Sequence, residues 1–180
     1  IPPRVPKIIF GTGAGYGPPP TIDQSFDFIC VRGPHTAAVL NLSAESVVTD
    51  AALLARKLSW QPRKITAPAI IIPHWQSCDF VDWPDLCHDA GIHFTDPRAS
   101  PEQVIGEIQA ASLVIAESLH AAILADAFRI PWIPIALYEH IDRDKWQDWL
   151  QTHHLDYHPH EFAGPYNSFF SAPSNCARYH

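Results

Sequence analysis

Residues 112–135 constrain the fold of this chain more than any other stretch of its sequence. The apolar run at 113–116 is short and rich in β-branched residues, which is typical of a strand buried on both faces. Apolar residues then recur at helical spacing, at Ala121, Ile123, Leu124, Ala127 and Phe128. A second apolar run contains Pro131 and Pro134, so we expect a strand that is short or near an edge. The stretch therefore predicts a strand, a turn, a helix and another strand.

The same pattern recurs along the chain. We expect strands at 7–10, 27–31, 47–49, 69–72 and 92–95, and helices at 35–40, 51–58, 82–90, 101–110 and 143–151. Gly91 is a suitable helix terminator, and Ser100 followed by Pro101 is a typical helix start. This alternation predicts an α/β fold, a Rossmann-like parallel sheet with helices on both faces. Residues 61–68 break the pattern and could link two lobes, at 1–60 and 69–152, and residues 153–180 are predicted to be an irregular tail.

Composition limits the classes of function. Hydrophobic residues make up 47% of the 180 residues, which supports a real core. A net charge of −7 disfavours nucleic acid as a partner, because phosphate contacts require clustered Lys and Arg. No run is long enough to span a bilayer. The four cysteines, Cys30, Cys78, Cys87 and Cys176, show no regular framework, so we expect free thiols in a reducing, cytoplasmic compartment. The chain begins at Ile1 and has no Met, so we expect it to be part of a longer protein.

Polar residues follow the predicted strands. Glu117, Ser118 and His120 lie between a strand and a helix, where anionic ligands bind in open α/β sheets. A bound phosphate would favour a protonated His120, which makes it a candidate general acid, although its position taken alone favours a capping or core role. Glu117 could orient His120 or act on the helix end through its charge, and Ser118 is the expected cap.

Other strand ends carry similar groups. Arg32 follows a strand and opens a helix, a suitable place for binding phosphate or carboxylate, or for bridging to a surface acid. His74, and the pair Asp96 and Arg98, follow two further strands, and Asp50 follows the strand at 47–49. The clustering of polar residues from three consecutive strands of the second lobe at one sheet edge is a stronger signal than any single residue, each of which could be an ordinary turn residue.

Three other features favour structural interpretations. The glycine run at 11–17 matches neither GxGxxG nor a P-loop, so it indicates a close backbone approach or a flexible loop. The histidines in the tail, His153, His154, His158 and His160, match no zinc spacing, so we expect solvated side chains and no metal. We expect core packing for Trp146, Trp149, Trp75 and Trp83, although the last two could stack on a sugar.

Taken together, the motifs at 10–17, 31–37, 49–54, 72–75, 91–98 and 116–122 occur in an order that resembles the polysaccharide pyruvyl transferase family. The chain is most similar to the bacterial branch that acts in succinoglycan-type exopolysaccharide synthesis. The resemblance covers about residues 10–149. It implies a two-lobed, glycosyltransferase-B-like architecture, of which this chain would hold the end of the first lobe and most of the second.

The resemblance also implies an activity, the transfer of a pyruvyl (carboxyethylidene) group from phosphoenolpyruvate to two sugar hydroxyls, without a further cofactor. His120 would then be the acid, with Glu117 stabilising its cation. Arg32, Arg98 and the amides around Ser118, Leu119 and His120 would bind the donor, and Asp50, His74 or Asp96 would be the base. Implied partners are the sugar acceptor, which could be lipid-linked at the inner membrane face, and other exopolysaccharide assembly enzymes. Two alternatives are a nucleotide-sugar glycosyltransferase of the same architecture and a noncatalytic saccharide-binding or assembly lobe.

Overall fold

The computed structural model describes residues 5–15, 17–18 and 21–161, and within them the chain forms two compact units. Of the described residues, unit 1 comprises those between 5 and 53 and those at 142–157, and unit 2 comprises those at 54–141 and 158–161. Residues 142–157, which the sequence analysis assigns to the second lobe and the tail, thus belong to the same unit as the N-terminal strands. In the described part of the chain, no helix is both long and apolar enough to cross a membrane.

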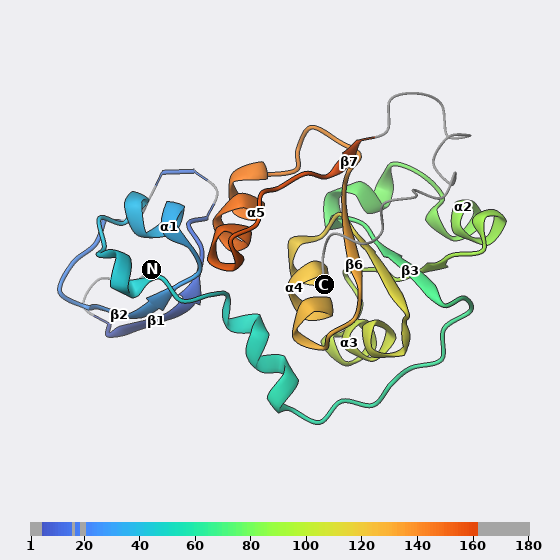
Figure 1. Ribbon diagram of the computed structural model, residues 1–180, viewed down its shortest axis with the longest axis horizontal. Helices are drawn as coiled ribbons and strands as arrows, with labels where there is room; N and C mark the ends of the chain where they lie inside the picture. Colours follow the sequence, from blue (N-terminus) through green and yellow to red (C-terminus); the bar gives the residue numbers. More distant parts are fainter. Residues whose placement is uncertain (1–4, 16, 19–20, 162–180) are drawn as a thin grey trace. The chain divides into compact units, whose positions relative to one another are not determined.

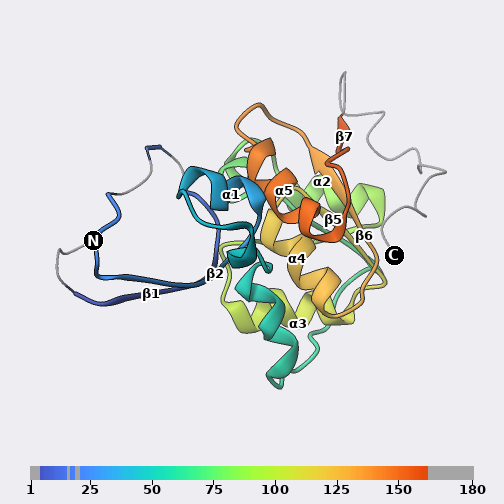
Figure 2. The same cartoon turned by 60° about the vertical axis from the view of Figure 1, so that its left-hand side comes forward.

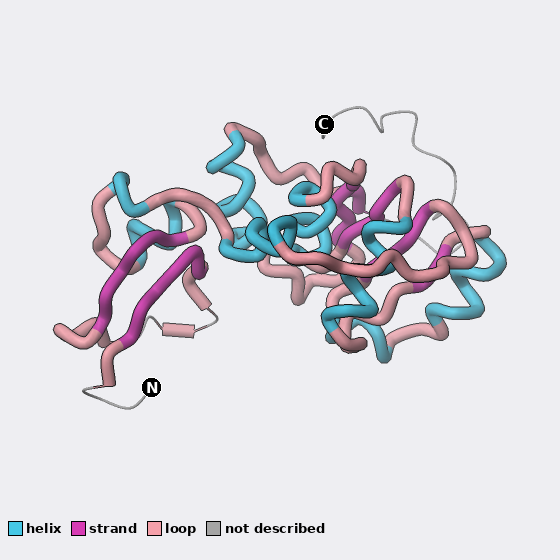
Figure 3. The backbone as a smooth tube through the Cα atoms, turned by 90° about the horizontal axis from the view of Figure 1, so that it is seen from below, coloured by secondary structure: helices cyan, strands magenta, loops and turns pink. Residues whose placement is uncertain are grey.

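Unit 1 contains a two-stranded parallel sheet and two α-helices (Figure 3). Strand β1 (Lys7–Thr12) pairs with β2 (Phe26–Val31), and α1 (Pro34–Val39) follows β2. Helix α5 (Arg143–Leu150) packs against α1, with Trp146 and Trp149 buried as predicted. The expected strand at 47–49 is reduced to a single bridge between Val47 and Val31, and the expected helix at 51–58 is a 3₁₀ helix, Ala51–Lys57.

Unit 2 confirms the predicted α/β class. Its five strands are all parallel, in the order β4-β3-β5-β6-β7. They are β3 (Ala69–Ile72), β4 (His93–Phe94), β5 (Leu113–Ala116), β6 (Trp132–Ala136) and β7 (His160–Glu161). Strand β7 lies in the segment expected to be irregular. Since β7 is a two-residue edge strand, Pro134 in β6 lies near the sheet edge, as predicted.

Helices cover both faces of this sheet (Figures 1 and 2). On one face, Trp83 and Cys87 of α2 (Trp83–Ala90) pack on Ile71 and Ile135. On the other face lie α3 (Pro101–Ala110) and α4 (Leu119–Ala127), which contact each other. Because successive side chains of a strand point to opposite faces, β3 contributes to both cores. Buried, unpaired Cys30, Cys78 and Cys87 agree with the expectation of free thiols, and Cys176 lies outside the described residues.

Candidate functional site

The order of the strands defines where unit 2 can bind a ligand. The chain runs from β3 to β4 on one side and then returns to place β5 on the other side of β3. The change of direction falls between β3 and β5, and ligands of open α/β sheets bind beyond the carboxyl ends of strands at such a point. His74 follows β3 and Glu117 follows β5, so the sequence analysis selected residues at this point.

The Glu117 side chain connects the ends of three adjacent strands. Its carboxylate accepts a hydrogen bond from the backbone N–H of His74, which follows β3, at 2.9 Å. The other oxygen accepts from the backbone N–H of Leu137, which follows β6, at 3.1 Å. Glu117 itself follows β5 and is fully buried. These contacts make Glu117 a positioning residue for the loops that begin at His74 and Leu137.

His120 lies at a pocket on the α3 and α4 face of the sheet. The pocket has a volume of about 190 Å³ and includes Ser118 and His120 at the start of α4, and Pro97, Ala99 and Pro101 before and at the start of α3. Its walls are mostly apolar, completed by Ile72, Val104, Ile105, Ala121 and Leu124. Both helices direct the positive ends of their dipoles toward this region. Ser118 occupies the N-cap position of α4, but its side chain makes no cap hydrogen bond, contrary to expectation.

Arg98 and Asp96 form an exposed polar cluster with Asp79. The Arg98 guanidinium donates to Asp96 at 3.0 Å and to Asp79 at 2.8 Å. The hydrogen bond from Arg98 lowers the pKa of the Asp96 carboxyl and so weakens it as a base. Arg98 follows β4 and therefore lies at the carboxyl edge of the sheet, but its charge is shared with two carboxylates.

An aromatic cluster surrounds the 3₁₀ helix η3 (Trp75–Asp79). The ring of His140 lies 5.1 Å from that of His74 and 5.8 Å from that of Phe80, and Phe80 meets Tyr138 edge to face at 4.7 Å. Cys78 is a buried residue of η3, and its burial together with nearby Asp96 raises the pKa of its thiol to about 11. A thiol that stays protonated at neutral pH is a poor nucleophile, so this edge is not organised for cysteine chemistry.

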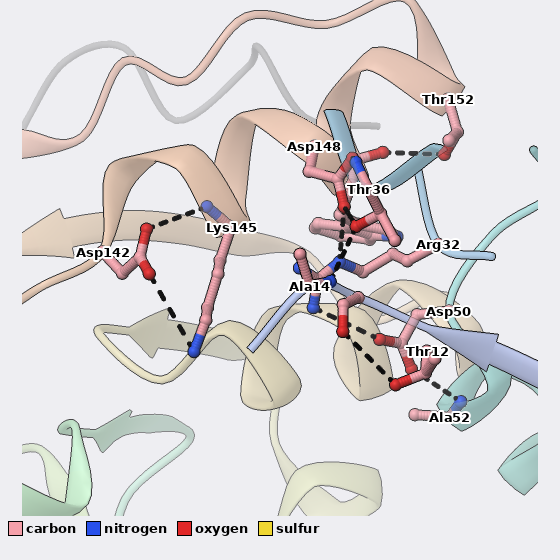
Figure 4. A network of polar contacts seen from close by, with 12 residues as sticks. Thr12, Ala14, Arg32, Thr36, Asp50, Ala52, Asp142, Lys145, Asp148 and Thr152 are labelled. Carbon is pink, nitrogen blue, oxygen red and sulfur yellow. Dashed lines mark hydrogen bonds and ion pairs between the residues drawn. The ribbon is translucent and has the colours of Figure 1, made fainter. Parts of the chain in front are cut away.

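The remaining predicted residues, Arg32 and Asp50, belong to unit 1 (Figure 4). The buried Arg32 guanidinium donates to Asp148 of α5 at 3.2 Å, and its Nη1 lies 3.8 Å from Asp50. Asp148 also accepts hydrogen bonds from the backbone N–H and the hydroxyl of Thr36, at 3.0 and 2.6 Å. A Cβ at Gly13 would clash with the guanidinium, so this glycine of the 11–17 run permits a close backbone approach.

The structure brings some predicted residues together and adds others. His74 and Glu117 share a hydrogen bond, Asp96 pairs with Arg98, and Arg32 lies near Asp50. Asp148 was not among the predicted site residues. Its signal in the sequence was an acidic residue placed between two inward-facing tryptophans on one predicted helix. Phe80, Tyr138 and His140 were also not predicted. Tyr138 and His140 follow a predicted strand, so the expectation that functional residues lie just after strands could have found them. Trp83 is buried as predicted, whereas Trp75 is 57% exposed, which corrects the expectation of core packing.

Comparison with known proteins completes the description. The polysaccharide pyruvyl transferase family model matches residues 3–138. The succinoglycan biosynthesis protein ExoV of Rhizobium meliloti (strain 1021) is 36% identical over 162 residues, which are 88% of this chain and 51% of that protein. The chain thus spans about half the length of this curated relative, and no solved structure matches it. Both matches cover the strand ends described above, and the chain belongs to the polysaccharide pyruvyl transferase family.

Proposed function

We propose that the protein transfers the pyruvyl group of phosphoenolpyruvate to two hydroxyls of a sugar in an exopolysaccharide repeat unit, forming a ketal and releasing phosphate. Family membership supports the pyruvyl transfer, and the similarity to the succinoglycan biosynthesis protein ExoV supports a saccharide acceptor. The two compact units are consistent with a two-lobed, glycosyltransferase-B-like architecture for the whole protein.

The observation that carries the proposal is the position of His120 at the pocket between the starts of α3 and α4. Two helix amino ends favour an anionic group there, and phosphoenolpyruvate carries a phosphate and a carboxylate. The Ser118 amide donates to the Ile72 carbonyl, so the backbone amides of Leu119 and His120 would receive one of these groups. In the proposal, Arg98 supplies a further contact to the donor.

His120 would act as general acid. Protonation of the donor's methylene carbon turns it into a methyl group and leaves a cationic, oxocarbenium-like carbon next to it. A sugar hydroxyl adds to that carbon and gives its proton to a base, and departure of phosphate creates the cation again. The second hydroxyl then closes the ketal, so one hydroxyl proton replaces the proton lost by His120 and the other leaves with phosphate.

Within unit 2, the candidates for the base are His74 and Asp96. Asp96 is the weaker of the two, because Arg98 stabilises its charged form. Glu117 supports the reaction indirectly through the backbone of His74. A lipid-linked acceptor would bring the enzyme to the inner face of the cytoplasmic membrane, together with other assembly enzymes.

The test uses the full-length protein with phosphoenolpyruvate and an oligosaccharide acceptor, and measures phosphate release. We expect His120→Gln to reduce turnover by about 10²–10⁴-fold, the usual contribution of a general acid, while phosphoenolpyruvate still binds in a calorimetric titration. Full turnover by His120→Gln would refute the assignment of the acid.

Two controls separate the alternatives. A glycosyltransferase of the same architecture would bind nucleotide sugars in the same titration, and we expect no heat from them. A noncatalytic lobe would release no phosphate with any acceptor, even in the unmodified full-length protein. As a matched substitution, His88→Gln changes an exposed histidine near the end of α2, and we expect it to leave turnover unchanged.

A further inference from the structure

We infer that the aromatic cluster at the carboxyl edge of the unit 2 sheet is a binding platform for a neutral saccharide, the acceptor subsite of the proposed reaction. We call it the aromatic platform: His74, Trp75, Phe80, Tyr138 and His140. The inference rests on the proposed function for the identity of the ligand as an acceptor, but the binding surface itself can be tested without the reaction.

Exposure of large aromatic side chains is the first observation. Trp75 is 57% exposed and Phe80 is 54% exposed, and they lie on and directly after the same short 3₁₀ helix. Exposed aromatic side chains that lie near one another are costly in water and mark a binding site more often than a single exposed residue does. Four of the rings form a connected set around His140, with centroid separations between 4.7 and 5.8 Å.

Polar groups beside the rings point to a sugar rather than to an apolar peptide. Asp79 immediately precedes Phe80 and pairs with Arg98, which also pairs with Asp96. Their exposed carboxylate and guanidinium groups offer acceptors and donors in planar arrays, which match the hydroxyls on the rim of a sugar ring. The C–H groups on the flat face of a hexose would meanwhile pack on the aromatic faces. Binding sites commonly combine an apolar floor with a few placed polar groups in this way.

The platform is also held in place, as a binding site must be. The loops that carry it begin at His74 and Leu137, whose backbone N–H groups both donate to the buried Glu117 carboxylate. A further contact joins the two loops, because Ser77 Oγ lies 3.1 Å from His140 Nε2. The platform therefore has fixed geometry at the sheet edge where ligands of this architecture bind.

The polar residues beside the platform carry two carboxylates, of Asp79 and Asp96, and one guanidinium, of Arg98. This excess of negative charge favours a neutral sugar over an acidic one. We choose cellotetraose as the probe, because β-linked glucose units have equatorial substituents and present flat C–H faces on both sides. Saturation-transfer NMR would detect its contact with the full-length protein, and a saturation-transfer titration over probe concentration would give the affinity. We expect millimolar binding, about tenfold weaker in Trp75→Ala and in Phe80→Ala, and largely restored in Trp75→Phe.

Phe10→Ala is the matched control, because Phe10 is an exposed aromatic residue of unit 1 outside the platform, and we expect unchanged binding. Absence of saturation transfer at 10 mM probe, or equal binding by the wild type and Trp75→Ala, would overturn the platform. A phosphoenolpyruvate titration distinguishes the two proposals. Loss of cellotetraose binding with intact phosphoenolpyruvate binding in Trp75→Ala supports the platform, whereas failure of the wild type to bind phosphoenolpyruvate refutes only the proposed reaction.

Discussion

At the scale of single residues, Glu117 has the clearest structural task. A fully buried carboxylate requires hydrogen bonds, and this one accepts them from two backbone N–H groups on neighbouring loops. Sequence reasoning identified Glu117 as part of the site. The two backbone N–H groups that it binds belong to residues 43 and 20 positions away, which no local pattern reveals.

The substitution Glu117→Gln tests this role. The amide oxygen of Gln can accept one of the two backbone hydrogen bonds, while its NH₂ group would face the other N–H donor. We expect a loss of about 1–3 kcal/mol of unfolding free energy, the cost of leaving one buried donor unsatisfied. Urea denaturation measures this, and the platform should bind cellotetraose more weakly as its loops loosen. Glu102→Gln, at an exposed position, should change stability by less than about 0.5 kcal/mol; an equal loss in both variants would contradict the role of Glu117.

At the scale of elements, the predicted bounds of helices and strands were correct where capping or chain-breaking residues stand at the ends of a segment. The bounds of β3, α3 and β5 agree with expectation, and Ser100 caps α3 by accepting a hydrogen bond from the Gln103 N–H. Prediction failed where pairing depends on a distant partner. Strand β7 exists because two residues of the tail meet the edge of β6, and its two-residue length carries no periodicity to detect. The exposure of Trp75 is likewise set by the surrounding loops and not by its own neighbours in sequence.

Helices α2 and α4 end in the same way but with different residues at the critical position. Each closes with a pair of hydrogen bonds around one residue in the left-handed region, Gly91 after α2 and Arg129 after α4. The left-handed region suits glycine and strains a residue with a Cβ atom. Space is not a constraint at Gly91, because a Cβ there would meet no atom within 4 Å.

Reciprocal substitutions should therefore have opposite effects. We expect Gly91→Ala to destabilise unit 2 by about 1 kcal/mol, and Arg129→Gly to stabilise it by up to about 1 kcal/mol. Thermal or urea denaturation followed by circular dichroism measures both. Gly15→Ala is the control, since Gly15 also has open space around it but is not among the residues with positive φ. A change of the same sign in Gly91→Ala and Arg129→Gly would show that backbone conformation does not control these helix ends.

At the scale of the whole molecule, the chain builds unit 1 from two segments that are far apart in sequence. The sequence predicted helix α5 correctly but could not show which unit it joins, because two inward-facing tryptophans do not by themselves specify a partner. The deciding feature is chemical: Asp148 supplies the carboxylate for the buried Arg32 and for the start of α1. Gly33 is part of the same fit, since a Cβ there would clash with the backbone of Asp148.

This arrangement predicts where the protein loosens when Asp148 is neutralised. In Asp148→Asn, the buried Arg32 guanidinium loses its closest counter-charge, and breaking a buried pair in this way costs about 3–5 kcal/mol. Hydrogen exchange read by mass spectrometry should then accelerate in peptides from β1, β2 and α1, while β3 and β5 keep their protection. Asp144→Asn, an exposed change on the same helix, should leave both units protected. Uniform acceleration across both units would mean that they unfold together, and an unchanged unit 1 would mean that Asp50 alone can neutralise Arg32.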